Sequence, residues 1–271
     1  MNIIGTVFRD IGKISRFTYG LSNLSVGDSI IVRTRHGLKF GRIVQVEVSD
    51  EIIPVEGLIL RKANKDDFEK NIRLKEMESE ALNIVKAKVF EHNLKMKMID
   101  AECMFDESKI IFYFSSEERV DFRILLSELV KVFKKWIELR QVNIRESAKI
   151  LGGIGVCGRS FCCSLFLREF QKVDVQLAVD QGILVNSSKL CGACGRLFCC
   201  LRYELENYQS TAKTMPRVGD LVRNSDGKLF LVCGLNILAH KIKLTPLETP
   251  EATPKYLPAE QFEIVDRSLD S

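Results

Sequence analysis

The stretch "NKDDFEKNIRLKEMESEALNIVKAKVFEH" (residues 64–92) predicts one long, highly charged helix at the centre of the chain. Asn64 is a typical helix-capping residue, and Asp66 and Asp67 follow it where the positive end of the helix dipole favours carboxylates. We expect the apolar residues to lie roughly on one face of this helix: Phe68, Ile72, Met77, Ala81, Ile84, Val85 and Val89.

The residues after this helix predict two strands, a second helix and a third strand. "LKMKMIDAECMF" (94–105) alternates like a strand, "KIIFYF" (109–114) is a second strand, and "IELRQVNI" (137–144) is a third. A helix is predicted from Asp121, with this buried stripe: Phe122, Leu125, Leu126, Leu129, Phe133 and Trp136. The order favours an α+β fold with a mixed or antiparallel sheet covered by helices.

Two similar segments predict small β-modules near the ends of the chain. "VGDSIIVRTRHGLKFGRIVQVEV" (26–48) has β-branched runs on each side of a turn at His36–Gly37, and "VGDLVRNSDGKLFLVCGLN" (218–236) turns at Asp226–Gly227. We interpret both as SH3-like barrels. The predicted segments are an N-terminal β-module 1–62, an α+β core 63–150, a cysteine-rich metal-binding segment 151–210, a C-terminal β-module 211–245 and an irregular tail 246–271.

The composition is that of an ordinary globular protein. The 271 residues are 46% hydrophobic and 28% charged, and the net charge of +4 permits acidic partners without indicating them. We find no signal peptide and no apolar run long enough to span a membrane, so we expect a cytoplasmic protein. In such a reducing compartment, nine cysteines are a poor disulfide framework.

Seven of the nine cysteines lie within residues 157–200. "CGRSFCC" (157–163) returns 37 residues later as "CGRLFCC" (194–200). The candidate metal ligands are Cys157, Cys162, Cys163, Cys191, Cys194, Cys199 and Cys200. Packing as a small apolar residue is the expected role of Cys103 and Cys233, but it does not explain thiols repeated beside glycines. We therefore favour metal binding for the seven.

The number and spacing of the thiols indicate iron–sulfur chemistry more than a single zinc ion. Only Cys191 and Cys194 have the C-x2-C spacing common in zinc sites, and adjacent cysteines are awkward ligands for one tetrahedral ion. One [4Fe–4S] cluster takes four thiolates, so seven suggest one cluster and a second site completed by a partner. Zinc remains the alternative. The histidines, His36, His92 and His240, are too distant in sequence to be assigned as ligands.

The residues around the cysteines suggest how the two copies meet. "LFLREFQKVDVQLAVDQG" (165–182) predicts a helix that folds the second copy toward the first; its stripe is Phe166, Phe170, Val173 and Leu177, and Gly182 caps its end. Arg159 and Arg196 occupy the same position in each copy, where a guanidinium could offset thiolate charge just outside the ligands. Phe161 and Phe198 also repeat, and we expect them to pack beside the site and limit water.

The motifs "GGIGVCGRSFCC" (152–163) and "GACGRLFCCLRYE" (192–204) resemble the bacterial YaaT/RicT family. The resemblance implies a cytoplasmic, non-catalytic regulatory subunit that joins small helical proteins of the YlbF and YmcA type. It also implies two [4Fe–4S] clusters in that complex, a role in messenger-RNA maturation with ribonuclease Y, and links to sporulation, competence and biofilm development. The implied ligands are Cys157, Cys162, Cys163, Cys194, Cys199 and Cys200. Cys191 is additional and could replace a partner ligand.

Two other functions compete with this adaptor. A thiol redox enzyme could use Cys191 and Cys194, but the predicted surroundings are not thioredoxin-like, and the sequence has no P-loop, G-x-S-x-G or H-E-x-x-H motif. A zinc-stabilised nucleic-acid-binding module could contact RNA through a basic run in the N-terminal module: Arg33, Arg35, Lys39 and Arg42. We predict a non-catalytic iron–sulfur adaptor whose cluster ties the cysteine segments together and orders a docking surface.

Overall fold

The computed structural model describes residues 2–9, 12–19, 24–48, 54–183, 190–249, 251 and 253–266. The chain divides into two compact units, Met1–Glu169 and Phe170–Ser271, and each unit is described by itself. The α+β class is confirmed. The exact boundaries of the five predicted segments stay predictions.

The first unit begins with a closed five-stranded barrel of strand order β1-β2-β5-β3-β4. Its strands are β1 (Asn2–Val7), β2 (Ser15–Thr18), β3 (Ser29–Thr34), β4 (Gly37–Val48) and β5 (Gly57–Lys62). The predicted turn at His36–Gly37 is confirmed, because β3 and β4 pair antiparallel from Thr34 and Gly37 onward. The barrel encloses a core of Ile4, Phe17, Ile30, Val32, Ile43 and Ile59. An SH3-like class for this barrel stays a prediction.

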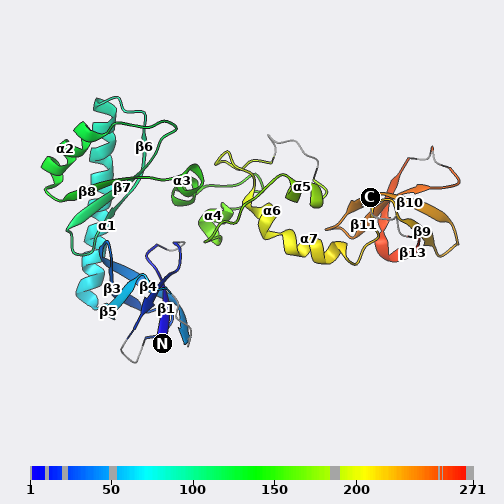
Figure 1. Cartoon of the computed structure of the whole chain (residues 1–271), viewed down its shortest axis with the longest axis horizontal. Helices are drawn as coiled ribbons and strands as arrows, with labels where there is room; N and C mark the ends of the chain where they lie inside the picture. Colours follow the sequence, from blue (N-terminus) through cyan, green and yellow to red (C-terminus); the bar gives the residue numbers. More distant parts are fainter. Residues whose placement is uncertain are drawn as a thin grey trace. The chain divides into compact units, whose positions relative to one another are not determined.

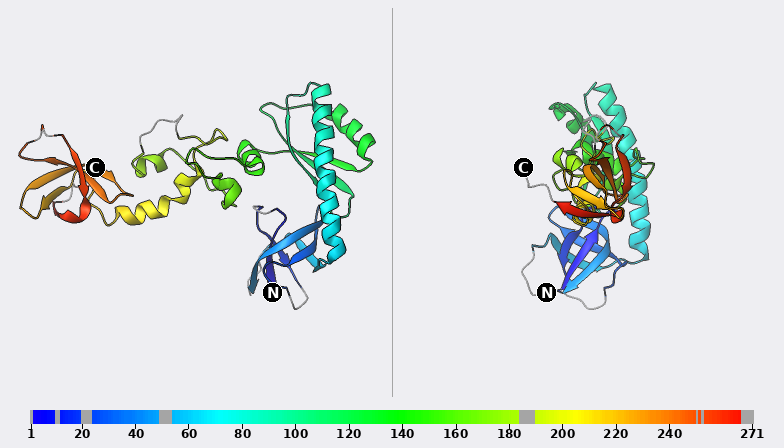
Figure 2. Two further views of the ribbon diagram at one scale, coloured as in Figure 1. Left: turned by 180° about the vertical axis from the view of Figure 1, so that it is seen from behind. Right: turned by 90° about the vertical axis from the view of Figure 1, so that its right-hand side faces the viewer.

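The long central helix is confirmed as α1 (Lys65–Glu91). Asn64 caps it, since its side chain accepts a hydrogen bond from the Asp67 backbone N–H, and the Asp67 carboxylate accepts one from the Asn64 N–H. Figures 1 and 2 show this helix beside both the barrel and the sheet that follows.

The buried face of α1 differs from the predicted one. The buried apolar residues are Leu74, Ala81, Val85 and Val89, whereas Phe68, Ile72 and Ile84 are exposed by 46%, 59% and 40%. Each helical residue advances by about 100°, which places Ile72 on the side opposite the buried line and Phe68 at its flank. The half-exposed Phe68 ring packs edge-on against Phe40 at 5.2 Å. The predicted stripe was therefore wrong at Ile72 and Ile84.

The predicted mixed sheet is confirmed by three strands, β6 (Lys97–Cys103), β7 (Lys109–Ser115) and β8 (Trp136–Gln141). β7 pairs antiparallel with β6 and parallel with β8. α1 and α2 (Arg123–Phe133) contribute to one core with this sheet and with Ile31 of the barrel. The barrel and the helix-covered sheet therefore share a core within the first unit.

Trp136 was wrongly predicted to belong to the buried stripe of the second helix. α2 ends at Phe133, and Lys134 closes it in the left-handed conformation at φ 53°. Trp136 instead begins β8, and it is 72% exposed. Two consecutive lysines after Phe133 favour this ending, because cations stabilise the negative end of a helix dipole.

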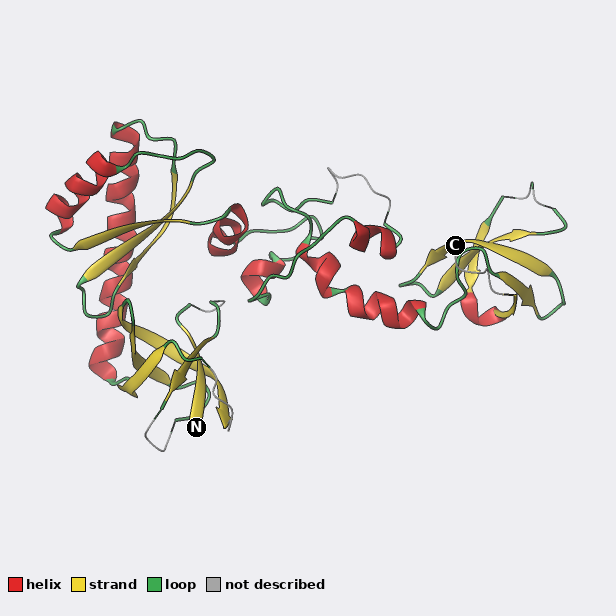
Figure 3. Cartoon of the chain, viewed as in Figure 1, coloured by secondary structure: helices red, strands yellow, loops and turns green. Residues whose placement is uncertain are grey.

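Short helices follow the sheet: α3 (Ile144–Leu151), α4 (Cys162–Leu165), α5 (Gln176–Asp180), α6 (Cys199–Tyr203) and α7 (Leu205–Ala212). The single helix predicted over 165–182 is wrong, and Figure 3 shows mostly coil between α4 and α5. Phe166 and Phe170 are 43% and 38% exposed, so the N-terminal half of the apolar stripe that would have stabilised such a helix is not buried. Gly182, at φ 70°, still ends the short α5 as expected of a C-terminal cap.

The second unit ends in a five-stranded sheet of order β12-β11-β10-β9-β13. Its strands are β9 (Leu221–Asn224), β10 (Leu229–Asn236), β11 (Lys241–Pro246), β12 (Lys255–Pro258) and β13 (Phe262–Asp266). The predicted turn at Asp226–Gly227 is confirmed between β9 and β10, where Gly227 has φ 81°.

The prediction of an irregular tail after residue 245 is wrong, because β12 and β13 complete this sheet. Pro254 and Pro258 lie before and at the end of β12, where a missing N–H is tolerated, and Phe262 packs edge-on against Phe230 at 5.6 Å. Among the residues that the structure describes, no helix is long and apolar enough to cross a membrane.

Candidate metal centre

The two cysteine motifs adopt the same backbone structure. We call residues 153–163 the first cysteine turn and residues 190–200 the second cysteine turn. Each contains an isolated antiparallel bridge, which pairs Ile154 with Ser160 in the first and Cys191 with Leu197 in the second. Each then enters a short helix at its adjacent cysteines. The 37-residue offset seen in the sequence is therefore also a structural repeat.

The same backbone hydrogen bonds hold both turns. The Gly155 N–H donates to the Arg159 carbonyl at 2.8 Å, and the Gly192 N–H donates to the Arg196 carbonyl at 2.9 Å. A second pair of bonds closes each turn before its helix. The Phe161 N–H donates to the Gly153 carbonyl at 3.0 Å, and the Phe198 N–H donates to the Leu190 carbonyl at 2.9 Å. Both bonds recur with partners shifted by 37 positions, so the repeat extends beyond the identical letters.

A glycine at the same position in each turn has a backbone conformation that other residues rarely adopt. Gly158 has φ 77° and Gly195 has φ 69°, and each follows the first cysteine of its motif. This left-handed conformation is readily available only to glycine. The glycine that follows the first cysteine of each motif is therefore required by the backbone, whatever the thiol binds.

The first thiol of each motif lies over a glycine of its own turn. A Cβ atom added to Gly155 would lie 3.5 Å from the Cys157 Sγ, and one added to Gly192 would lie 3.8 Å from the Cys194 Sγ. Cys157 is exposed, and Cys194 is partly buried. These thiols thus occupy matching places, with the first more open to solvent.

The adjacent cysteines form the first two residues of a helix in each turn. Cys162 and Cys163 begin α4, and Cys199 and Cys200 begin α6. Successive helical side chains point about 100° apart, so the two thiols of a pair face different directions. In the first turn the difference is large, because Cys163 is only 6% exposed while Cys162 is partly accessible.

The first cysteine turn is anchored to the first unit through α3. This helix packs against α4 and also contacts β6 and β7. Its Lys149 donates to the Arg168 carbonyl at 3.2 Å, and Arg168 donates to the Gly12 carbonyl at 2.8 Å. Burial lowers the pKa of Lys149, whereas the thiol of Cys163 acts in the opposite direction. This lysine near the buried thiol was not predicted from the sequence, since 14 positions separate Lys149 from Cys163.

The second cysteine turn has a small apolar core of its own. Leu177 and Ala178 of α5 pack with Leu190 and Leu201 of the turn and its helix. Phe198 packs at the edge of this cluster, and the Phe161 ring crowds Gly153 in the first turn. The two repeated phenylalanines therefore pack beside their turns, as predicted.

The structure explains what distinguishes Cys191 from the six motif cysteines. Cys191 occupies the bridge position of the second turn, and the equivalent residue of the first turn is Ile154, which is 66% exposed. The second turn thus has one more potential ligand than the first. Alignment of the two motifs at their full length would have revealed this difference.

Arg159 and Arg196 lie in matching exposed positions at the tips of their turns. Their carbonyl groups accept the turn hydrogen bonds, a role that any residue could fill. A role of the guanidinium groups just outside the ligands stays a prediction.

In the described part of the chain, which includes all seven cysteines, no three His, Cys, Asp or Glu side chains are grouped closely enough to hold a metal ion. The donor chemistry nevertheless fits a soft metal, because thiolates suit iron–sulfur clusters and zinc. The seven ligand assignments therefore stay predictions.

Two cysteines outside the turns differ from each other. Cys103 is buried in the core, and burial raises its thiol pKa to about 11, which agrees with packing alone. Cys233 was also predicted to be packed, but it is exposed on β10, with its Sγ 3.3 Å from the Lys243 carbonyl. Cys233 follows the buried Val232 and lies at the register shift between Val232 and Gly234, where the pairing of β10 with β11 is irregular.

The basic run predicted to contact nucleic acid is not a uniform surface. Arg33, Arg35 and Arg42 are exposed, whereas Lys39 donates to Glu102 at 2.6 Å and its side chain is only 18% exposed. Lys39 is therefore part of the interior of the first unit.

Two family descriptions match separate parts of the chain. Residues 57–142 match the family described as the PSP1 C-terminal conserved region, and residues 172–215 match the third domain of PSP1-like proteins. The first cysteine turn lies between these two matched ranges.

Curated relatives come from bacteria and yeasts. The stage 0 sporulation protein YaaT of Bacillus subtilis is 40% identical over 250 residues, which cover 90% of this chain and 89% of that protein. An uncharacterized protein of Schizosaccharomyces pombe is 35% identical over 38% of this chain and 14% of its own, and the PSP1 protein of Saccharomyces cerevisiae is 48% identical over 17% and 6%. No solved structure matches. Because the Bacillus relative is similar along nearly its whole length, the chain belongs to the YaaT/RicT family, which contains the PSP1 C-terminal region.

Proposed function

We propose that the chain is a non-catalytic iron–sulfur adaptor in sporulation-related regulation. Its thiols hold [4Fe–4S] clusters, and it joins small helical proteins of the YlbF and YmcA type. The complex acts with ribonuclease Y on messenger-RNA maturation in the cytoplasm. The regulatory role is supported by the 40% identity to a stage 0 sporulation protein. The cluster and the partners rest on the motif resemblance and on the chemistry of the thiols.

One observation carries the cluster proposal: the same turn occurs twice, with thiols at the same three positions. Packing does not account for the first thiol of each motif, because Cys157 is exposed and Cys194 is only partly buried. The repeated backbone hydrogen bonds hold the thiols at equivalent places in the two turns. They do not bring the thiols of one turn together around a single point. Such a set suits a group that accepts ligands from several segments, as clusters do.

The residues around the thiols have defined roles in this proposal. The phenylalanines of both turns exclude water on one side, and Lys149 supplies a positive charge near Cys163. A bound cluster would cross-link the cysteine segments and would make them sensitive to oxidation. Its loss would loosen the turns and the docking surface that they form.

Anaerobic purification of the full chain, followed by iron, sulfide, zinc and absorption measurements, tests the cluster. We expect iron and acid-labile sulfide in equal amounts, and a large loss of both in Cys199→Ser. Cys233→Ser is the matched control, since this exposed thiol lies outside the turns. Cys191→Ser then decides whether the additional thiol is a ligand.

Two results would contradict the assignment. Stoichiometric zinc without sulfide would show a zinc site instead of a cluster. Unchanged iron and sulfide in Cys199→Ser would show that this thiol is not a ligand. The adaptor role is tested with the same preparations: the iron-loaded chain should bind the helical proteins of its source, and the iron-depleted chain should bind them at least about tenfold more weakly. Equal binding by the two preparations would show that the adaptor role does not depend on the cluster.

A further inference from the structure

A polar cavity in the first unit lies far along the chain from the cysteine turns and has no role in the proposed function. It has a volume of about 320 Å³ and is enclosed by the end of β1, by β4, by α1 and by β6. Residues 71, 74, 75 and 78 of α1 all face it, as the helical repeat places them on one side. Its size falls at the lower end of the range typical of small-molecule sites.

The charges of the lining favour an anion. Four cationic side chains line the cavity, Arg9, Lys39, Arg42 and Lys75, against two carboxylates. Two of these cations already pair with carboxylates, Arg9 with Asp100 and Lys39 with Glu102. One carboxylate, Glu102, is already occupied, because it accepts hydrogen bonds from Lys39 and Tyr113, each at 2.6 Å. The other, Glu78, accepts from the Cys103 N–H at 2.7 Å, and burial raises its pKa. Outside these two ion pairs, the lining holds two cations, Arg42 and Lys75, and one carboxylate, Glu78.

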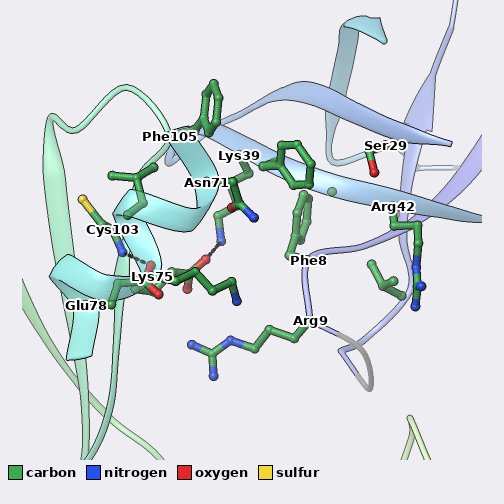
Figure 4. A pocket seen from close by; sticks show the side chains of 15 residues that line it. Phe8, Arg9, Ser29, Lys39, Arg42, Asn71, Lys75, Glu78, Cys103 and Phe105 are labelled. Carbon is green, nitrogen blue, oxygen red and sulfur yellow. Dashed lines mark hydrogen bonds and ion pairs between the residues drawn. The ribbon is translucent and has the colours of Figure 1, made fainter. Parts of the chain in front are cut away.

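The remaining lining groups suit a flat, polar ring. Phe8, Phe40 and Phe105 line the cavity, and Phe40 and Phe105 lie 6.1 Å apart at a tilt of 33°. Lys39 lies over the Phe8 ring and Lys70 over the Phe105 ring, each at 5.1 Å, so one face of each of these two rings is already covered. Asn71 offers both a donor and an acceptor, and Figure 4 shows its side chain in the same hollow as those of Lys75 and Arg9. Aromatic faces stack on nucleobases, and amide groups hydrogen-bond to their edges.

We propose that this cavity binds a nucleoside phosphate, with the base against the phenylalanine rings and the phosphate at the cationic rim that includes Lys75. The ring accounts for the aromatic wall and Asn71, and the phosphate accounts for the surplus of cations. A simple inorganic anion would leave the aromatic wall without a role. A free nucleotide and the phosphorylated end of an RNA chain share this chemistry.

Ligand-observed NMR and calorimetry with the full chain test the proposal. The probes are adenosine and guanosine 5′-monophosphate, a 5′-phosphorylated dinucleotide, ribose 5-phosphate and inorganic phosphate. We expect a mononucleotide or the dinucleotide to bind at least about tenfold more tightly than ribose 5-phosphate or inorganic phosphate. Preference for the mononucleotide indicates a free ligand, and preference for the dinucleotide indicates an RNA end.

A matched pair of variants places the binding in the cavity. Lys75→Glu should weaken it by at least about tenfold, since a charge-assisted contact to phosphate is reversed. Lys86→Glu makes the same charge change at an exposed position of α1 away from the cavity, and it should leave binding unchanged. Circular dichroism checks that both variants are folded.

Three outcomes would overturn the proposal. They are no nucleotide binding at about 5 mM ligand, equal affinity for inorganic phosphate, or equal weakening by Lys75→Glu and Lys86→Glu. Because none of these probes involves iron, failure here leaves the cluster proposal intact, and the reverse also holds.

Discussion

Glu102 is a carboxylate of the first unit with several polar partners. It lies on β6, where Lys39 and Tyr113 donate to its two oxygens and Arg9 lies nearby. Burial alone would raise the pKa of Glu102, but the charge and hydrogen bond of Lys39, with Tyr113 and Arg9, outweigh burial and lower it. Burial and the same carboxylate raise the pKa of Tyr113. This network connects the barrel to the sheet.

Glu102→Gln should destabilise the first unit by about 1–3 kcal/mol at pH 7, because it leaves Lys39 without its charged partner. Since the folded-state pKa of Glu102 is below the ordinary value of about 4.3, its stabilising effect is present above that value and is lost as the pH falls through the folded-state pKa. The variant should therefore lose less stability than the natural chain between about pH 5 and pH 3. Urea unfolding across this range measures the difference.

Glu69→Gln is the control for this prediction, as Glu69 is exposed on α1. It should change stability by no more than about 0.5 kcal/mol at either pH. Equal acid sensitivity of Glu102→Gln and the natural chain would show that the network does not stabilise the fold through this charge.

Lys39 also shows why single residues were hard to place from the sequence. Its neighbours Arg33, Arg35 and Arg42 suggested a basic surface, but its partner Glu102 lies 63 residues away. Strand alternation gives the face of the barrel on which a residue lies. It does not show which other element covers that face. A basic residue paired inside the unit and a basic residue exposed to solvent therefore have the same local sequence pattern.

At the scale of elements, the capping box of α1 allows a direct test of how the long helix is stabilised. Asn64→Ala removes the side-chain acceptor for the Asp67 N–H and should cost about 1 kcal/mol of the free energy of unfolding. Asn83→Ala makes the same change in the exposed middle of the helix, where alanine should be neutral or stabilising by a few tenths of a kcal/mol. Chemical denaturation of both variants measures the contrast, and equal effects would exclude a capping role.

The second cysteine turn gives a second contrast between neighbouring residues. Gly195→Ala forces a left-handed backbone on a residue with a side chain and should destabilise the second unit by about 1–2 kcal/mol. Gly192 is outside the left-handed region, and a Cβ there would meet only ordinary contacts of 3.8 Å or more, so Gly192→Ala should cost clearly less. Hydrogen exchange of the turn amides measures both. A larger effect at Gly192 would contradict the backbone explanation.

Elements with strong periodicity could be predicted from the sequence, and the others could not. The helix over 65–91 and the strands β6, β7 and β8 have long patterns bounded by caps or turns. The segment 165–182 has a helical pattern too, but its buried residues, Leu177, Ala178 and Gln181, all lie in its C-terminal part. Helical spacing predicts a helix only where another element is present to cover its stripe.

The thiols themselves were identifiable from the sequence because the motif repeats, and the turn geometry around them was not. Nothing in the letters indicates that Gly155 and Gly192 donate equivalent hydrogen bonds, or that Cys163 is buried while Cys157 is exposed. These differences depend on α3 and α5, which pack beside the turns and have unrelated sequences.

At the scale of the whole molecule, the two compact units should each fold as separate fragments. Residues 1–169 contain the barrel core and the larger core shared with the sheet, and residues 170–271 contain two smaller apolar clusters. Each fragment should give a cooperative thermal transition, and the first should be the more stable, because it buries more apolar surface. Circular dichroism and calorimetry of both fragments check this.

Iron analysis of the same fragments extends the prediction to the proposed cluster. Each fragment has at most four of the seven candidate thiols. If ligands from both fragments are needed, each should hold less iron per chain than the intact protein. A full iron content in the second fragment alone would assign the cluster to Cys191, Cys194, Cys199 and Cys200.

The two cysteine turns have equal length, matching hydrogen bonds and a matching left-handed glycine. They are therefore exchangeable parts: residues 154–163 can be grafted in place of residues 191–200, or the reverse, without a new loop conformation. Such chimeras would change the number of thiols by one, through Ile154 and Cys191, while the backbone stays the same. The chain thus offers a way to vary ligand count independently of fold.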